Sequence, residues 1–152
     1  MAVLKIDRVG EFGNVLRKKC AEVSDVSDPE IQNFIVDLME TLVASDTENS
    51  KAVGIAAPQV GRAIQIIIVR TNGYEAIMIN PKILSRSSME ESGEEGCLSV
   101  PGIFKKKKRS KTVEVSYIDP QGFEISAKLK DKIARIFLHE FDHLNGKLFT
   151  DK

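Results

Sequence analysis

His139 and His143 are the only histidines in this chain of 152 residues, and they lie four positions apart in the segment His-Glu-Phe-Asp-His. Side chains four residues apart share one face of an α-helix, so both imidazoles can bind the same ion. Glu140, one position further round, can reach a water molecule at that ion without being a ligand itself. The pattern predicts two metal ligands and a general base on one helix. The alternative is a polar helix that contains this pattern by chance.

The sequence around the histidines has the periodicity of a helix. Asp131 is the predicted N-cap, and Asn145 with Gly146 supplies a stop signal. Between them, residues of one face recur at intervals of three and four: Ile133, Ile136, Phe137, Glu140, His143 and Leu144. The neighbouring flank is also apolar, so we expect a largely buried helix. Imidazoles and a carboxylate inside such a helix need partners, which a metal ion supplies.

A catalytic site of this kind usually has three protein ligands and one open position. Phe149 stands where some metalloproteases carry a third histidine. No glutamate follows His143, so the third ligand must lie upstream, and the candidates are a cysteine or a carboxylate. Cys20 has no motif around it, whereas glycines and a proline flank Cys97 and constrain its backbone. We favour Cys97, although a lone cysteine is ordinarily a small buried apolar residue.

Three stretches together resemble the signature motifs of peptide deformylases. They are residues 54–59, 95–102 and 139–146, which occur in the family's order and at its approximate separations. The resemblance extends from the region of Leu16 and Arg17 to Phe149. We expect an α+β fold, with antiparallel and mixed strands packed around a central metal-binding helix. The resemblance implies a metal-dependent hydrolase that removes the N-formyl group from the formyl-methionine of nascent peptides and releases formate.

The resemblance also implies roles for individual residues. It gives three metal ligands: Cys97, His139 and His143. It gives three catalytic residues: Glu140 as acid/base, and Gln59 with the main-chain N–H of Leu98 as donors to the formyl oxygen. It gives four residues of the substrate cleft: Val53, Gly54, Glu95 and Gly96. Arg109 matches an arginine that commonly pairs with the glutamate at position 95.

The expected chemistry agrees with these roles. Attack on a formyl carbon creates an oxyanion, and its donors must be placed for the tetrahedral state. Gln59 and Leu98 each provide one N–H group for that purpose. The family is associated with one divalent ion, Fe(II) physiologically, with Ni or Co active and Zn usually poorer. A Cys-His-His set alone does not choose among these metals.

The chain departs from the family's motifs at three points. Ala52 replaces a glycine at the start of the first motif, and Leu138 replaces a glutamine before the first histidine. An arginine that often follows the second motif is absent, with Ile103 and Phe104 in its neighbourhood. None of these changes removes a ligand, the base or an oxyanion donor. We expect them to affect substrate affinity and side-chain preference more than the reaction.

Length and composition favour one catalytic domain over residues 1–152. We also expect a monomer that acts in the cytoplasm. Lys and Arg number 22 against 22 Asp and Glu, so no global attraction to nucleic acid or membranes follows. Two distant cysteines do not indicate a disulfide framework. The N-terminus has no apolar run typical of a signal peptide or a membrane span. The end at Lys152 is similar to compact deformylases without a C-terminal tail, including those of phages.

The remaining pattern predicts the other elements. Residues 1–26 are expected to be irregular, with short extended pieces, and residues 45–52 to form a polar loop. Asp28 and Pro29 begin a predicted helix that extends to about Val43. We expect strands at residues 64–69, at 76–83 with a break at Asn80 and Pro81, and in a hairpin of residues 112–118 and 123–129.

An acidic run of glutamates between residues 90 and 95 precedes Cys97, and a basic run follows at residues 105–109. Such runs are usually solvated faces. The functional alternative is that residues 105–108 help to dock the protein on the ribosome. An RNA-binding module is disfavoured by the zero net charge and the lack of interleaved aromatic residues.

Two other functions compete with deformylation. A zinc peptidase-like hydrolase would act on ordinary peptide bonds and cleave unformylated peptides. A metal-stabilised binding protein would retain the fold without turnover, but a purely structural ion has no use for a base such as Glu140 beside it.

Overall fold

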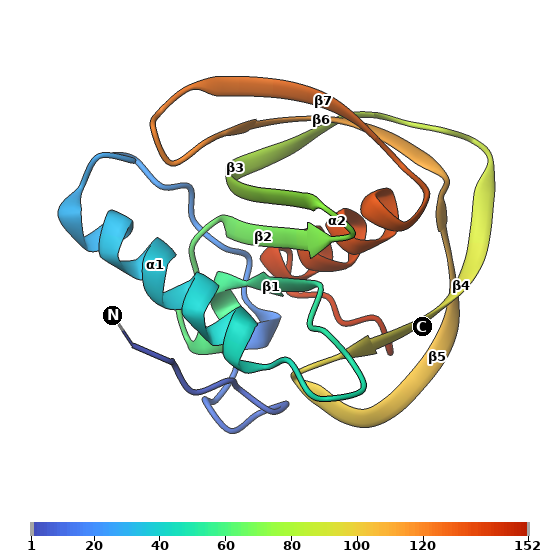
Figure 1. Cartoon of the computed structure of the whole chain (residues 1–152), viewed down its shortest axis with the longest axis horizontal. Coiled ribbons are helices and arrows are strands. Elements are labelled where there is room, and N and C mark those ends of the chain that lie inside the picture. Colours follow the sequence, from blue (N-terminus) through green and yellow to red (C-terminus); the bar gives the residue numbers. More distant parts are fainter. Residues whose placement is uncertain (1, 152) are drawn as a thin grey trace.

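The computed structural model describes residues 2–151 and confirms an α+β fold (Figure 1). One sheet has the strand order β1-β2-β3-β6-β7, and a second contains β4 and β5. The strands are β1 (Gly54–Ala56), β2 (Ile66–Thr71), β3 (Tyr74–Arg86), β4 (Glu90–Cys97), β5 (Val100–Ser110), β6 (Thr112–Ile118) and β7 (Glu124–Lys130). The helices are α1 (Pro29–Ala44), α2 (Asp131–Leu144) and the 3-10 turns η1 (Val15–Arg17) and η2 (Ala57–Val60). Neighbouring strands in both sheets are antiparallel.

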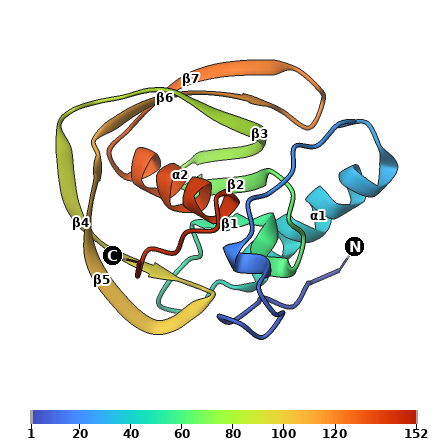
Figure 2. The same ribbon diagram turned by 180° about the vertical axis from the view of Figure 1, so that it is seen from behind.

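Strand β2 separates two apolar cores. Because successive side chains of a strand point to opposite faces, Ile66 and Ile68 pack with α1, whereas Ile67 and Val69 pack with α2. All four are fully buried. Removing each such side chain from water stabilises the fold by roughly 1.5–3 kcal/mol. Helix α2 is therefore central, lying between the large sheet and the hairpin formed by β4 and β5 (Figure 2).

Helix α1 begins as predicted. The carboxylate of Asp28 accepts a hydrogen bond from the Glu30 backbone N–H at 2.9 Å, and Pro29 occupies the first helical position. This satisfies one of the N–H groups that have no partner within the helix.

The predicted N-cap of α2 is wrong. Lys130 is the capping residue, no side-chain hydrogen bond caps the helix, and Asp131 is its first residue with φ of 54°. The backbone N–H of Asp131 instead donates to the Lys111 carbonyl at 2.8 Å. The pairing of β6 with β7 thus continues to the first residue of the helix, which fixes where α2 begins.

The predicted strands are present with shifted ends. The strand expected at residues 64–69 is β2, two residues later, and the hairpin is β6 and β7. The expected break at Asn80 and Pro81 is wrong, because β3 continues through it. Asn80 has φ of 52°, and the register with β6 shifts between Ile79 and Lys82. Pro81 lies in this bulge, where a missing ladder N–H is tolerated.

Strands β4 and β5 were not predicted as a hairpin. Glutamates of one strand pair in register with basic residues of the other, as at Glu94 with Lys106 and Glu95 with Lys105. Lys105, Lys106 and Lys108 are exposed, as expected for a solvated run, but Arg109 is buried. The hairpin curves around α2 and carries Cys97 at the end of β4 (Figure 1).

The N-terminal arm has little regular structure, as expected. It contains η1 and two isolated bridges, from Lys19 to Asn145 and from Ala21 to Ile64. The Cys20 N–H donates to the Leu144 carbonyl at 2.8 Å, so the arm is attached to the end of α2. Within residues 2–151, no helix has the length and apolar character needed to span a membrane.

Candidate active site

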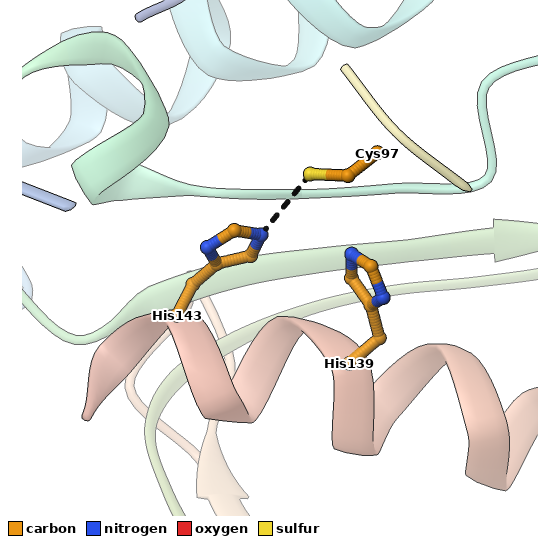
Figure 3. Close-up of side chains that lie close together, drawn as sticks. All are labelled: Cys97, His139 and His143. Atoms are coloured by element: carbon orange, nitrogen blue, oxygen red, sulfur yellow. Dashed lines mark hydrogen bonds between the residues drawn. The ribbon is translucent and has the colours of Figure 1, made fainter. Parts of the chain in front are cut away.

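Helix α2 and the end of β4 bring three ligand-type side chains together. His139 and His143 lie on successive turns of α2, and Cys97 faces them from β4 (Figure 3). One ligand atom from each residue lies within 4.8 Å of the others. The Cys97 Sγ is 3.4 Å from His143 Nε2. The predicted i and i+4 geometry of the histidines is therefore present.

The donor set fits a metal ion. Two donors on one tetrahedral ion of the zinc type lie roughly 3.3–3.8 Å apart, which matches the Cys97 to His143 separation. Burial lowers the pKa of His143 to about 3, and the nearby charge of Arg109 acts in the same direction. The imidazole of His143 is thus neutral at pH 7 and free to bind a cation. Thiol and imidazole donors suit borderline metals.

Glu95 fixes the orientation of His139. Its Oε1 lies 2.9 Å from His139 Nδ1, so the imidazole's other nitrogen faces the cluster. Arg109 makes two hydrogen bonds of 2.9 Å to the same carboxylate, as expected from the sequence. Burial favours a raised pKa for Glu95, but the hydrogen bonds from Arg109 and His139 outweigh it and hold the pKa well below its usual range. Glu95 is therefore ionised and serves as the acceptor for His139.

Glu140 lies beside the three ligand-type residues. It is 4% exposed, and its Oε1 has no hydrogen-bond partner among the described residues. Burial raises the pKa of Glu140 to about 7. A carboxyl group with a pKa near neutrality can both accept and return a proton at physiological pH. The other oxygen, Oε2, lies against Gly54, where a Cβ would be only 2.6 Å away.

Gln59 has a fixed orientation. Its Oε1 accepts a hydrogen bond from the Ala56 N–H at 2.9 Å, so its amide nitrogen points toward the cluster. That nitrogen lies 3.6 Å from Cys97 Sγ and 3.2 Å from the buried Ser99 hydroxyl. The 3-10 turn η2 places Gln59 immediately after β1. An N–H donor is thus aimed at the space beside the cysteine.

A cleft of about 440 Å³ opens onto the site. All four residues expected in the substrate cleft border it, as does Leu98: Val53, Gly54, Glu95 and Gly96. The carboxylate of Glu95 is occupied by its bonds to protein groups, so its contribution to the cleft is structural. Basic side chains border the cleft too: Lys51, Lys132 and Arg135.

The three departures from the family's motifs have distinct surroundings. Ala52 borders the cleft, and its carbonyl accepts hydrogen bonds from Arg70. Leu138 is buried in the core around α2, where an amide would need a partner. Phe104 is 66% exposed, and its ring lies against Gly96 at the cleft. An aromatic surface therefore borders the cleft beside Gly96.

Phe149, which occupies the position of a third histidine in some metalloproteases, packs against His139 with ring centroids 5.6 Å apart. It covers the imidazole from the C-terminal segment.

Sequence reasoning missed three polar residues around the site. Ser99 accepts from Gln59, Asp142 accepts from Arg109 at 2.6 Å, and Arg135 donates to Glu95 at 2.7 Å. Arg135 could have been identified from the sequence as a neighbour of the site, because it lies four residues before His139 and therefore on the same helical face.

Comparison with known proteins agrees with this geometry. Residues 3–152 match the polypeptide deformylase family. A peptide deformylase of Pseudothermotoga lettingae is 42% identical over 98% of this chain and 82% of its own length. The crystal structure of peptide deformylase from Thermotoga maritima superposes with a TM-score of 0.92 at 36% identity, covering 100% of this chain and 98% of the other. That of a peptide deformylase from Synechococcus elongatus in complex with actinonin gives a TM-score of 0.89 at 36% identity, covering 99% and 79%.

The matches span almost the whole chain, and the matched region includes the Cys97, His139 and His143 cluster. The chain belongs to the peptide deformylase family, metal-dependent enzymes that remove the N-formyl group from nascent peptides.

Proposed function

We propose that Cys97, His139 and His143 bind one divalent metal ion and that Glu140 acts beside it as the acid/base in deformylation. The observation that carries this proposal is the position of Glu140, which lines the same cleft as Cys97 and His139 and whose buried Oε1 has no hydrogen-bond partner within residues 2–151. A structural ion would not require an ionisable group there.

The ion, when bound, acts as a Lewis acid and makes water nucleophilic near neutral pH. Glu140 accepts the proton of the attacking water and returns it to the nitrogen of the departing amine. The C–N bond of the formamide breaks, formate leaves, and the peptide keeps a free amino group. The Gln59 amide and the Leu98 main-chain N–H donate to the oxyanion of the tetrahedral state. Removing one such donor raises the barrier by about 3 kcal/mol.

We propose Fe(II) as the physiological metal, with Ni, Co or Zn as substitutes. The mixed thiol and imidazole donor set accepts all four ions and does not choose among them, so the choice of Fe(II) rests on the metal associated with the family. Purification under anaerobic conditions, followed by reconstitution with each metal in turn, distinguishes them. The highest rate of formate release should come from the Fe(II) protein, and exposure to air should abolish that activity before it affects the Ni(II) form.

The choice of substrate tests the reaction itself. We expect formate from formyl-Met-Ala-Ser, and no cleavage of the unformylated Met-Ala-Ser by the same metal-loaded protein. Mass spectrometry of the products separates loss of the formyl group from cleavage of a peptide bond. Cleavage of the Met-Ala bond in the unformylated peptide would instead support a peptidase.

We further propose that residues 1–152 form one catalytic domain that acts as a monomer on formyl-methionyl chains in the cytoplasm. The exposed lysines of β5 are the proposed ribosome contact. Replacing residues 105–108 with serine should sharply reduce co-sedimentation with ribosomes while leaving formate release from a free tripeptide unchanged. Unchanged co-sedimentation would exclude docking by this strand.

A further inference from the structure

Arg135 joins helix α2 to both strands of the β4 and β5 hairpin. Its guanidinium donates to the Glu91 carbonyl at 2.6 Å and to the Gly93 carbonyl at 3.4 Å, both on β4. It also donates to the Lys107 carbonyl of β5 at 2.8 Å and to Glu95 Oε2 at 2.7 Å. Four acceptors on two strands thus hold a single side chain, which is only 16% exposed.

Gly93 makes this position possible. A Cβ at residue 93 would lie 2.8 Å from both Nε and Cζ of Arg135. Real Cβ atoms do not approach other heavy atoms so closely, so any side chain at residue 93 would displace the guanidinium. The φ angle of Gly93 is not positive, so the backbone conformation does not require glycine here. Glycine is required because a side chain would have no room beside Arg135.

Arg135 and His139 contact the same carboxylate, that of Glu95. One oxygen of Glu95 lies 2.9 Å from His139 Nδ1 and also accepts from Arg109. The other oxygen accepts from Arg109 and Arg135. A partner of this kind holds a ligating imidazole in the correct orientation, and its loss typically costs 10–100-fold in metal affinity.

We propose that Arg135 is a positioning residue for the metal site, which acts through Glu95 on His139 and depends on the free space at Gly93. This inference rests on the proposed function, because it requires His139 to be a metal ligand. Arg135 lies one helical turn before His139. Its guanidinium therefore connects α2 to the hairpin and to the Glu95 carboxylate close to the turn that carries His139. Arg109 holds the same carboxylate from β5, and Arg135 holds it from α2, the helix that bears the two histidines.

The test compares zinc affinity, measured by competition with a chromophoric chelator, in the wild type and in Arg135→Met, Arg135→Lys and Gly93→Ala. We expect zinc affinity to fall about tenfold in Arg135→Met. We expect a similar fall in Gly93→Ala, because this variant keeps Arg135 but displaces its guanidinium. Arg135→Lys should recover little, because one ammonium group cannot reach acceptors on both strands. Arg86→Met, which removes an exposed arginine of β3, is the matched control and should bind zinc as the wild type does.

The double variant Gly93→Ala/Arg135→Met distinguishes a shared cause from two separate defects. If alanine acts only by displacing Arg135, the double variant binds zinc no more weakly than Arg135→Met alone. Fully additive losses would contradict the proposed link between the two residues.

The two histidines allow a second readout by ¹⁵N NMR of the zinc-loaded proteins. Both Arg135→Met and Gly93→Ala should shift the Nδ1 resonance of His139 more than that of His143, which a general loss of stability would not do. Zinc affinity within twofold of the wild type, with unchanged His139 resonances in both variants, would overturn the inference. A wild type that binds no zinc would instead contradict the proposed metal site.

Discussion

Gly54 controls the position of the proposed base, because the missing side chain lets Glu140 lie directly against the backbone of β1. A methyl group there would be 2.6 Å from Glu140 Oε2. Gly54→Ala should therefore lower kcat at least 100-fold by displacing the carboxylate, with metal affinity within twofold of the wild type. Formate release and zinc titration on the same preparation measure both effects. If Gly54→Ala keeps more than half of the wild-type kcat, Glu140 is not constrained in the way the structure indicates.

The two cysteines should differ in reactivity. Cys20 is 4% exposed, and burial raises the pKa of its thiol to about 11. Cys97 borders the cleft. Because alkylation requires an accessible thiolate, iodoacetamide at pH 8 should label the metal-free protein once, at Cys97. Peptide mass spectrometry identifies the site, and Cys97→Ser is the control that should remain unlabelled. Saturating zinc should protect Cys97; labelling of Cys20 under native conditions would contradict its burial.

At the scale of elements, Asp46 and Arg70 attach the loop before β1 to the end of β2. Asp46 Oδ1 accepts from the Ala52 N–H at 2.7 Å and from Arg70 at 2.6 Å. The Ala52 hydrogen bond and the charge of Arg70 outweigh partial burial and lower the pKa of Asp46. A carboxyl group with a lowered pKa in the folded state stabilises that state above its unfolded pKa, and the contribution disappears as the pH falls through the folded pKa.

Asp46→Asn keeps an oxygen acceptor for Ala52 but removes the charge. It should be less stable to urea than the wild type at pH 7, and this difference should be smaller at about pH 3, which is below the unfolded pKa of an aspartate. A difference of the same size at both pH values would mean that the carboxylate charge contributes nothing. Circular dichroism during urea titration measures both proteins.

Elements were predictable from sequence where local signals agreed. The Asp28 cap, the apolar stripe of α1 and the turn between β6 and β7 all depend on nearby residues. Strands β4 and β5 have no such signal, because they consist largely of charged residues and glycine without an alternating apolar pattern. They gain stability from cross-strand pairs and from contacts such as Arg135 with Lys107. The start of α2 was misplaced for a similar reason, since a contact from Asp131 to the Lys111 carbonyl overrides the capping preference.

The site was predictable to the extent that it lies in short motifs. Cys97, His139 and His143 were assigned from spacing and resemblance, and the structure brings their ligand atoms together. Arg135 and Ser99 were not identified, because their roles arise only when β4, β5 and α2 pack together. The sequence could not show that Gly93 and Arg135 occupy adjoining space.

At the scale of the whole molecule, the proposed ligands join β4 to α2, two elements far apart in the chain. An ion that binds only the folded state stabilises it by about 2.7 kcal/mol at 100 times its Kd, which corresponds to a rise in Tm of roughly 5–11 °C for a domain of this size. Zinc should therefore raise the Tm of the metal-free wild type, but not that of His143→Ala. An equal shift in both proteins, measured by calorimetry, would place the ion elsewhere.

The most direct test of the account is formate release from formyl-Met-Ala-Ser by the anaerobic Fe(II) protein and by Glu140→Gln with the same metal content. The substitution preserves shape and leaves the ligands in place, so only proton transfer is removed. The account predicts formate from the wild type and a rate at least 100-fold lower from the metal-loaded variant. Comparable rates from the two proteins would contradict the assignment of Glu140 as the base and, with it, the proposed mechanism.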